Sequence, residues 1–384
     1  MYNLLRSIFE LLRKTFIRTF SVILFLSSDM IYGQIDPNAT SETKALYKNL
    51  KSIGATGSLF GHQDAPAYGL NLDGTRWVAD ESRSDIKTIL GEQPALLGFD
   101  LGHLELGKFA NLDDVPFNKI KQYIEEQYDR GGVSTISWHP NNPLDYSKTT
   151  WDKVEATIPT LLNNKKALRN YQKTSLKKLS KFFKSLKGAD GKAVPVIFRP
   201  YHEHTGSWFW WGADYCTEKE YKAFWQMTVN YLAKKKVHNL LYAYSTDNFR
   251  SEVHYLERYP GDSFVDILGF DSYHRNAPKS NEQFVNNAQR MLGTIKELGL
   301  EKDKPYAVSE TGLERVTEDN WWTNIVLSVI GESEAAYILF WRNGRPDHFY
   351  APYPGHTSEA DFKKMAASGK ILFEEGAKKA NLYK

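Results

Sequence analysis

A group of charged and aromatic residues follows an apolar run near the middle of the chain. The run Val194–Phe198 is typical of a buried strand, and it leads into the sequence RPYHEHTGSWFWWG at 199–212. Burying Glu203 beside Arg199 and two histidines costs free energy unless each group is paired, so folding alone gives little reason to assemble them. Three tryptophans in this segment follow no helical or alternating period: Trp208, Trp210 and Trp211.

Aromatic rings beside a carboxylic acid suit a sugar. A pyranose has apolar C–H faces for stacking, and its glycosidic oxygen needs a proton donor when the bond breaks. Trp138 and Trp341 are further candidates for stacking, although for these two, as for Trp210 and Trp211, packing over the rim of the fold is an equal alternative. A buried Glu–Arg pair under a tryptophan-rich loop is the alternative interpretation of the whole segment.

A second glutamate, Glu310, follows the apolar run Tyr306–Ser309 in the same way that Glu203 follows its own. Glycoside hydrolysis needs two carboxyl groups, one to protonate the leaving oxygen and one to act at the anomeric carbon. Glu203 and Glu310 are the candidate pair for these two roles, and the residues alone leave open which of them is the acid. Tyr273 can donate a hydrogen bond to Glu310, and Arg199 can keep that carboxylate ionised. Repulsion between the two carboxyl groups should raise the pKa of the acid.

Eight apolar runs alternate with amphipathic stretches along the chain. The predicted strands are 58–62, 95–100, 133–138, 194–198, 240–244, 265–270, 306–309 and 336–341, and the predicted helices are 82–90, 117–130, 155–187, 217–236, 252–259, 280–298, 319–331 and 358–380. Eight β–α units predict an α/β fold, a single (β/α)8 TIM barrel whose active site lies at the carboxyl ends of the strands. An open doubly wound sheet is the fallback, which no Gly-x-Gly-x-x-Gly or phosphate-loop pattern supports.

Polar and aromatic residues gather just past every predicted strand, as the barrel requires. In chain order they are His62, Gln63 and Asp64; Asp100 and His103; Trp138, His139 and Asn141; the 199–212 segment; Asp247 and Asn248; Asp271, Ser272 and Tyr273; Glu310 and Thr311; and Trp341, Arg342 and Asn343. Five histidines follow strand ends and leave zinc-dependent hydrolysis as an alternative: His62, His103, His139, His202 and His204. No His-x-x-x-His pattern is present, so we expect neither a metal nor another cofactor.

The charge and cysteine content of the chain exclude several kinds of site and partner. The 384 residues carry 49 basic and 46 acidic side chains, a net charge of +3, which gives no strong overall field for nucleic acid or an anionic membrane. A single cysteine, Cys216, excludes an intramolecular disulfide and a multi-cysteine metal site. No linker or repeat divides the chain, so we expect one catalytic domain over residues 34–384, acting as a monomer.

In the first 33 residues a basic region, an apolar run and a polar region follow one another as in a secretory signal peptide. Basic residues precede the apolar run Phe20–Leu26, which is too short to span a bilayer, and polar residues follow it. We expect cleavage after Gly33 and export to the periplasm or the medium, with no membrane anchor afterwards. The alternative is an uncleaved amphipathic anchor, because leucines and Ile8 in the first turns fall at helical spacing.

The motifs together resemble glycoside hydrolase family 26 and, within it, the β-mannanases. The resemblance covers roughly residues 40 to 375 and rests on the 199–212 segment together with five others: GHQD at 61–64, ISWHP at 136–140, FDSY at 270–273, SETG at 309–312, and WRN at 341–343 leading to HFYAP at 348–352. It implies a retaining mechanism on the backbone of β-1,4-mannan.

Matched position by position, the resemblance places Glu203 on the family's acid/base and Glu310 on its nucleophile. His202 and Trp208 match residues that hold the sugar at the scissile bond, and Tyr273 matches the tyrosine that positions the nucleophile. His139 and Arg342 match contacts on the glycone side, and we add Trp341 and Asp271 as candidate substrate contacts.

The sequence therefore predicts an exported endo-β-1,4-mannanase acting on mannan, galactomannan or glucomannan. Three alternatives stay open: release of mannobiose from a chain end, action of the same fold on xylan or mixed-linkage β-glucan, and a carbohydrate-binding protein with an inactive barrel. Retention of both glutamates argues against the last.

Overall fold

The computed structural model describes residues 33–79, 83–331 and 333–384. The compact unit Gln34–Lys384 is separate from Met1–Gly33. Residues 1–32 of the expected signal lie outside the described residues.

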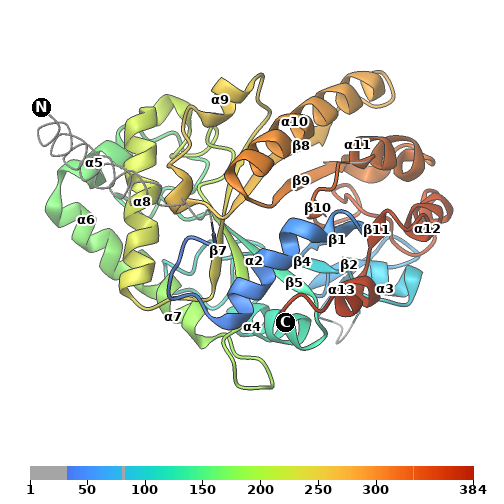
Figure 1. The fold of residues 1–384 in the computed structure, drawn as a ribbon, viewed down its shortest axis with the longest axis horizontal. Coiled ribbons are helices and arrows are strands. Elements are labelled where there is room, and N and C mark those ends of the chain that lie inside the picture. Colours follow the sequence, from blue (N-terminus) through green and yellow to red (C-terminus); the bar gives the residue numbers. More distant parts are fainter. Residues whose placement is uncertain (1–32, 80–82, 332) are drawn as a thin grey trace, which may run out of the picture. The chain divides into compact units, whose positions relative to one another are not determined.

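Eight parallel strands close into a barrel (Figure 1). Each strand pairs with the next along the chain, and β10 pairs back onto β1 with Leu59 opposite Tyr337 and His62 opposite Phe340. The predicted (β/α)8 fold is confirmed. The barrel strands are β1 (Ser58–Gln63), β4 (Leu96–Asp100), β5 (Val133–Trp138), β6 (Val196–Pro200), β7 (Leu240–Thr246), β8 (Ile267–His274), β9 (Tyr306–Leu313) and β10 (Tyr337–Phe340).

All eight predicted strands are present, and the differences lie at their ends. β8 and β9 run four residues further than predicted, through Tyr273 and Glu310, so both of these residues lie on strands rather than loops. A hairpin of β2 (Tyr68–Leu70) and β3 (Arg76–Val78) was not predicted. Neither was β11 (Ile371–Leu372), which pairs with β1 outside the barrel.

The helices form the outer layer of the barrel in Figure 1. The predicted 155–187 helix is interrupted at Asn164, whose side chain caps a second helix. The predicted 358–380 helix is two helices flanking β11, and α2 was not predicted. The α-helices are α2 (Ser41–Ile53), α3 (Asp85–Leu90), α4 (Phe117–Asp129), α5 (Thr157–Asn163), α6 (Lys165–Tyr171), α7 (Lys177–Ser185), α8 (Glu218–Lys234), α9 (Glu252–Leu256), α10 (Asn281–Lys302), α11 (Leu327–Ile330), α12 (Glu359–Ala367) and α13 (Glu374–Ala380).

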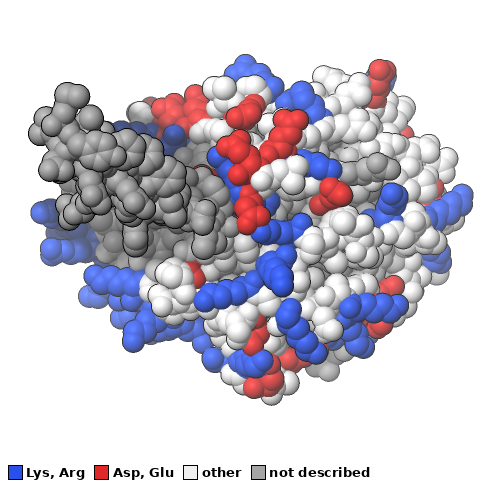
Figure 2. Space-filling view, viewed as in Figure 1, with Lys and Arg blue, Asp and Glu red and all other residues white. Residues whose placement is uncertain are grey.

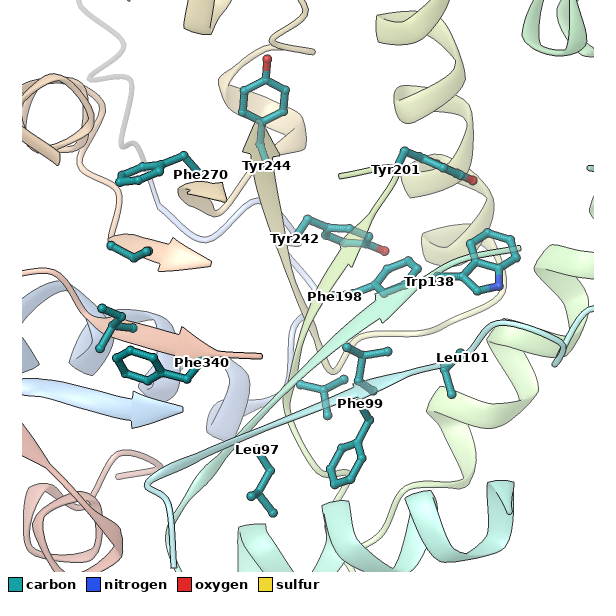
Figure 3. Close-up of a cluster of buried hydrophobic side chains, with 14 of the residues drawn as sticks. Leu97, Phe99, Leu101, Trp138, Phe198, Tyr201, Tyr242, Tyr244, Phe270 and Phe340 are labelled. Atoms are coloured by element: carbon teal, nitrogen blue, oxygen red, sulfur yellow. The ribbon is translucent and has the colours of Figure 1, made fainter. Parts of the chain in front are cut away.

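Two apolar layers hold the barrel together. Alternate strand residues point outward against the helices, and Figure 3 shows members of this layer, among them Phe99, Phe198 and Phe340. The other residues point inward and form a second cluster with α2, in which Leu96 and Ile197 join Leu50. Because strand side chains alternate in this way, the polar residues at the strand ends are held by two rigid layers.

Among the described residues, no helix is both long enough and apolar enough to cross a bilayer.

Candidate active site

Glu203 lies in the tight turn that follows β6. Its backbone adopts the left-handed region with φ of 51°, and its N–H donates to the carbonyl of Ser245 on β7 at 3.0 Å. Tyr201 has φ of 51° as well. Non-glycine residues rarely adopt this conformation, and where they do the strain is often found at functional sites. The turn thus presents the half-buried Glu203 carboxyl group at the carboxyl end of the barrel.

Trp208 covers this turn. Its indole Nε1 donates to Oε2 of Glu203 at 2.6 Å, and the side chain is 39% exposed. Gly206 makes the approach possible, because a Cβ atom at that position would lie 2.2 Å from the Trp208 ring. The acid therefore sits beside an exposed aromatic face, which is the arrangement that sugar stacking requires.

Glu310 lies on β9 at a bulge. Phe270 of β8 is opposite Val308, but the next residue, Asp271, is opposite Glu310, so Ser309 is extra in β9. A bulge changes the direction of the neighbouring side chain. Gly269 leaves the room for it, since a Cβ atom there would lie 2.0 Å from Ser309 Oγ.

Arg199 connects the carboxylates of β8 and β9. Its guanidinium donates to Oδ2 of Asp271 at 2.7 Å and also forms an ion pair with Oε1 of Glu310. Burial works against the charge of Arg199, but the two carboxylates hold its pKa above the usual value. Tyr273 donates to Oε2 of Glu310 at 2.8 Å. Both Glu310 oxygens therefore accept charge-assisted or hydroxyl hydrogen bonds, which suits an ionised nucleophile.

Glu203 has the opposite electrostatic setting. Burial raises the pKa of its carboxyl group well above the usual value, and the negative charges of Asp271, Glu310 and Asp247 raise it further, against the lowering effect of the Trp208 bond. The protonated form of one glutamate is thus favoured, while its neighbour accepts a hydrogen bond on each carboxylate oxygen. A carboxyl group that favours its protonated form beside one bonded as a carboxylate is the arrangement that acid/base catalysis at a glycosidic bond needs.

His202 lies beneath these groups and is 1% exposed. Burial, followed by the charge of Arg199, lowers its pKa well below the ordinary histidine value, so the ring is neutral. One ligand atom each from His202, Asp271 and Glu310 lie within 4.8 Å of one another, a spacing that could hold a metal ion. However, the Arg199 guanidinium already binds both carboxylates. A divalent cation would therefore meet a fixed positive charge, and this cluster fits metal binding poorly.

His139 forms a second wall of the site at the end of β5. Its Nδ1 is 2.7 Å from Oδ2 of Asp100, and its ring lies 4.5 Å from the ring of His202 and 5.6 Å from that of Trp151. Asp100 also accepts from Ser137 Oγ at 2.8 Å. The carboxylate fixes the orientation of the His139 ring, so that its other nitrogen can serve a hydroxyl group.

A cleft of about 600 Å³ opens from Glu203 and Trp208 away from His139. Its walls come from the ends of β7 and β8 and from the first turns of α10, and most of the groups are polar. The residues lining it beyond Glu203 and Trp208 are Asp247, Asn248, Ser272, Tyr273, Arg275, Asn276, Ser280, Gln283, Phe284 and Asn287. Such a volume with converging polar groups is typical of a ligand site. Sequence reasoning missed the α10 residues, which follow the strand end by a turn or more and carry no motif.

For three of the tryptophans the structure selects packing, which the sequence left as an equal alternative to sugar stacking. Trp138, Trp210 and Trp211 are fully buried, and each indole N–H is engaged, with Glu105, the Pro140 carbonyl and the His202 carbonyl respectively. They support the loop rather than offer a face for sugar. No signal in the sequence separates the exposed Trp208 from the buried Trp210 and Trp211, because these three tryptophans lie in the same polar, aromatic segment.

Asp271 is placed differently from the prediction. It is 0% exposed and accepts from Ser245 Oγ at 2.7 Å as well as from Arg199, so in this structure it supports Arg199 beneath the cleft and does not line it. Arg342 is half-buried, forms an ion pair with Asp113, and has its guanidinium carbon 5.9 Å from the ring centroid of the half-buried Trp341. These last two residues lie after β10, outside the cleft lining.

Comparisons with known proteins agree with this geometry. A solved β-mannanase of glycoside hydrolase family 26 from Bacteroides ovatus is 42% identical with a TM-score of 0.84, covering 90% of this chain and 98% of that one. A modular endo-β-1,4-mannanase from Cellulomonas fimi is 30% identical with a TM-score of 0.80, covering 90% of this chain and 79% of that one.

A mannan endo-1,4-β-mannosidase from Bifidobacterium adolescentis is 32% identical over 363 residues, or 88% of this chain. The chain spans only 35% of the length of that relative. The model of one family, described as glycosyl hydrolase family 26, matches residues 35–304, a range that includes Glu203 and the whole of β6 to β8. With the barrel and the paired carboxyl groups at its carboxyl end, this match shows that the chain belongs to glycosyl hydrolase family 26.

Proposed function

We propose that this chain is an endo-acting hydrolase of β-1,4-mannosidic bonds that works by double displacement with retention. The observation that carries the proposal is the contrast between Glu203, whose pKa is raised by burial and by neighbouring negative charges, and Glu310, which is bonded by Arg199 and Tyr273. The names of the relatives support mannan as the substrate.

In the first step Glu203 donates its proton to the glycosidic oxygen while Glu310 attacks the anomeric carbon. The bond to the leaving sugar breaks and an ester forms between the remaining sugar and Glu310. Each oxygen of Glu310 accepts one hydrogen bond, from Arg199 or Tyr273, so a lone pair remains for attack. The leaving sugar is accommodated in the polar cleft beside Glu203 and Trp208.

In the second step Glu203 acts as a base. The negative charge of Glu310 is one cause of the raised pKa of Glu203, and the ester removes that charge. The pKa of Glu203 therefore falls in the intermediate, so the group that has just lost its proton can accept one from water. The water attacks the anomeric carbon, the ester breaks, and Glu310 returns as a carboxylate.

The experiment compares wild type, Glu203→Gln and Glu310→Gln on linear mannan, xylan and mixed-linkage glucan. Glu314→Gln is the matched control, because Glu314 is an exposed acid just after β9 that pairs with His348. We expect mannan hydrolysis by wild type and control, and a loss of about 100-fold or more in both catalytic variants. Proton NMR of the first product should show the β-anomer, and a ladder of sizes shows internal cleavage.

Other outcomes would change the assignment. Cleavage of xylan or glucan with intact mannan would keep the mechanism and replace the substrate. Mannobiose as the sole early product would replace internal with end-wise cleavage, and an initial α-anomer would replace retention with inversion. Binding of mannan without cleavage would leave a carbohydrate-binding protein.

We also propose that the chain is exported, on the strength of the basic and apolar segments within residues 1–26. The test is expression of the full chain in a bacterial host, followed by fractionation and N-terminal sequencing. A periplasmic or secreted chain that begins near Gln34 supports the proposal. An intact N-terminus in the cytoplasmic or membrane fraction contradicts it.

A further inference from the structure

The crossover from β5 to β6 carries an unusual concentration of positive charge. Residues 156–189 contain nine lysines and arginines and no aspartate or glutamate, although the whole chain is nearly balanced. Eight of the nine are exposed: Lys165, Lys166, Arg169, Lys173, Lys177, Lys181, Lys184 and Lys187. We call these eight residues the basic stripe.

Seven of the eight residues of the basic stripe lie along one continuous helix, and Lys187 follows its end. Residues 165–185 form α6, a π-helical turn over Gln172–Leu176, and α7, a length of about 30 Å. Arg169, Lys173, Lys177 and Lys181 are spaced four residues apart. A regular α-helix has about 3.6 residues per turn, so side chains at this spacing would move gradually around the helix axis. The π-helical turn, whose hydrogen bonds span five residues, absorbs an extra residue and keeps the cations aligned.

The opposite face of this helix is buried. Tyr171, Leu176, Leu179 and Phe183 are at most 1% exposed and pack into the outer apolar layer of the barrel. The helix is thus rigidly fixed, with its cations directed to solvent. In Figure 2 the part of the surface over α6 and α7 that is visible carries many blue and few red atoms.

The segment that carries the basic stripe, residues 156–189, holds no acidic side chain with which its cations could pair. Within the described part of the chain, none of the eight cations forms an ion pair, whereas Lys121, Arg130 and Lys363 on other helices do. The acidic residue Glu125 lies just past the carboxyl-terminal end of α7, where its side chain accepts a hydrogen bond from the backbone N–H of Lys187 at 2.7 Å. Eight unpaired like charges repel each other, a cost that folding alone does not explain.

The shape and chemistry of the basic stripe identify the kind of partner. It is a row on the outer wall of the barrel, fixed by the buried face of the helix, and none of its residues lines one of the four pockets described for residues 33–79, 83–331 and 333–384. None of the exposed large apolar side chains among the described residues lies between 157 and 187, so binding would be electrostatic and without insertion. A flat, anionic surface matches these features, and a row of cations near such a surface gains affinity with each residue.

We propose that the basic stripe docks the protein onto an anionic phospholipid surface. The active site opens at the carboxyl ends of the strands, whereas the basic stripe lies on the side wall of the barrel. Docking therefore leaves the cleft free to bind substrate. This surface is independent of the hydrolytic mechanism, and an inactive Glu203→Gln chain should dock as wild type does.

The test is sedimentation of the full chain with vesicles of phosphatidylcholine alone or with about 30% phosphatidylglycerol. The variant K173E/K177E/K181E/K184E is compared with the matched control K48E/K364E/K370E/K379E, which makes the same change in net charge at exposed lysines elsewhere. The first 33 residues are common to all chains, so any contribution from them cancels. Equal melting temperatures and equal mannan hydrolysis show that all chains are folded.

We expect wild type and control to bind the anionic vesicles and the basic-stripe variant to bind about 100-fold more weakly or not at all, since each cation near the surface contributes roughly fivefold. Binding should disappear at about 0.5 M salt, where screening is strong. The proposal is overturned if wild type does not bind, if the basic-stripe variant and control lose binding equally, or if both bind as wild type. Binding of heparin or DNA without binding of the vesicles would replace the lipid with a soluble polyanion.

Discussion

The indole of Trp208 donates a hydrogen bond of 2.6 Å to the carboxyl group of Glu203. One side chain thus serves two purposes, because it exposes an aromatic face to the cleft and also stabilises the ionised form of the acid. The bond lowers the pKa of Glu203, against burial and three negative neighbours that raise it.

Trp208→Phe keeps a ring and removes the hydrogen bond. The pKa of Glu203 should rise, so the protonated acid should persist to higher pH and the alkaline limb of the kcat/KM profile should move upward. We expect kcat/KM at the optimum to fall by about 10- to 100-fold, as for the loss of a bond to a charged group. Measurement of kcat/KM on mannan oligosaccharides across pH tests this, and an unchanged alkaline limb would contradict it.

Asp247→Asn should move the alkaline limb of the kcat/KM profile to lower pH. Asp247 lines the cleft, and its negative charge is one cause of the raised pKa of Glu203. Removing that charge lowers the pKa of Glu203, so the acid loses its proton at lower pH. Glu314→Gln also removes one acidic charge but is not among the causes, and its profile should match wild type. A shift of equal size in both variants would show that net charge alone is responsible.

Arg199→Met should destabilise the fold as well as abolish activity. The guanidinium is 2% exposed and pairs with two buried carboxylates, so its removal leaves Asp271 and Glu310 without a countercharge. Breaking a buried ion pair from one side costs about 3–5 kcal/mol. Burial raises the pKa of Asp271, so the free energy of unfolding, measured by denaturant titration, should approach that of wild type as pH falls and this carboxyl group takes up a proton. A deficit that is constant from neutral to acidic pH would indicate a packing defect instead.

Gly269→Ala tests the bulge in β9. A Cβ atom at Gly269 would meet Ser309 Oγ at 2.0 Å, so Ser309 must move. Because Ser309 is 0% exposed, we expect the bulge to shift and to carry Glu310 with it, rather than the hydroxyl alone to rotate away. We expect kcat to fall by at least about 100-fold, because misplacement of a catalytic group by about 1 Å has this effect. Gly293→Ala is the control. It lies within α10 with no atom inside 4 Å of its Cβ position, and should stabilise the protein by about 0.5–1 kcal/mol.

The sequence predicted the barrel well because its signals are local. Runs such as Val196, Ile197 and Phe198 on β6 are apolar on both sides of the sheet, and turns or polar residues bound them. The catalytic candidates were accessible to the same reasoning, since Glu203 and Glu310 follow or end such runs. Helix α2 was missed because its apolar face is a short stripe within a mostly polar segment.

The sequence could not predict which individual polar and aromatic residues are buried. Trp208 and Trp210 are two positions apart, yet one is 39% exposed and the other 0%. The difference depends on the left-handed turn at Glu203 and on the space at Gly206, and neither leaves a periodic pattern. Asp271 was placed in the cleft for the same reason, because its partners Arg199 and Ser245 come from other strands.

The extra residue Ser309 in β9 also sets a limit on how this chain can change. Side chains alternate along a strand, so deletion of that single residue would exchange the inward and outward positions on one side of the deletion relative to the other. Glu310 would then be carried toward the helices, or the apolar residues before it toward the cleft. Loss or gain of residues is tolerable in the loops that follow the strands, but the length of β9 between Val308 and Glu310 is as much a requirement of the active site as the identity of the glutamate.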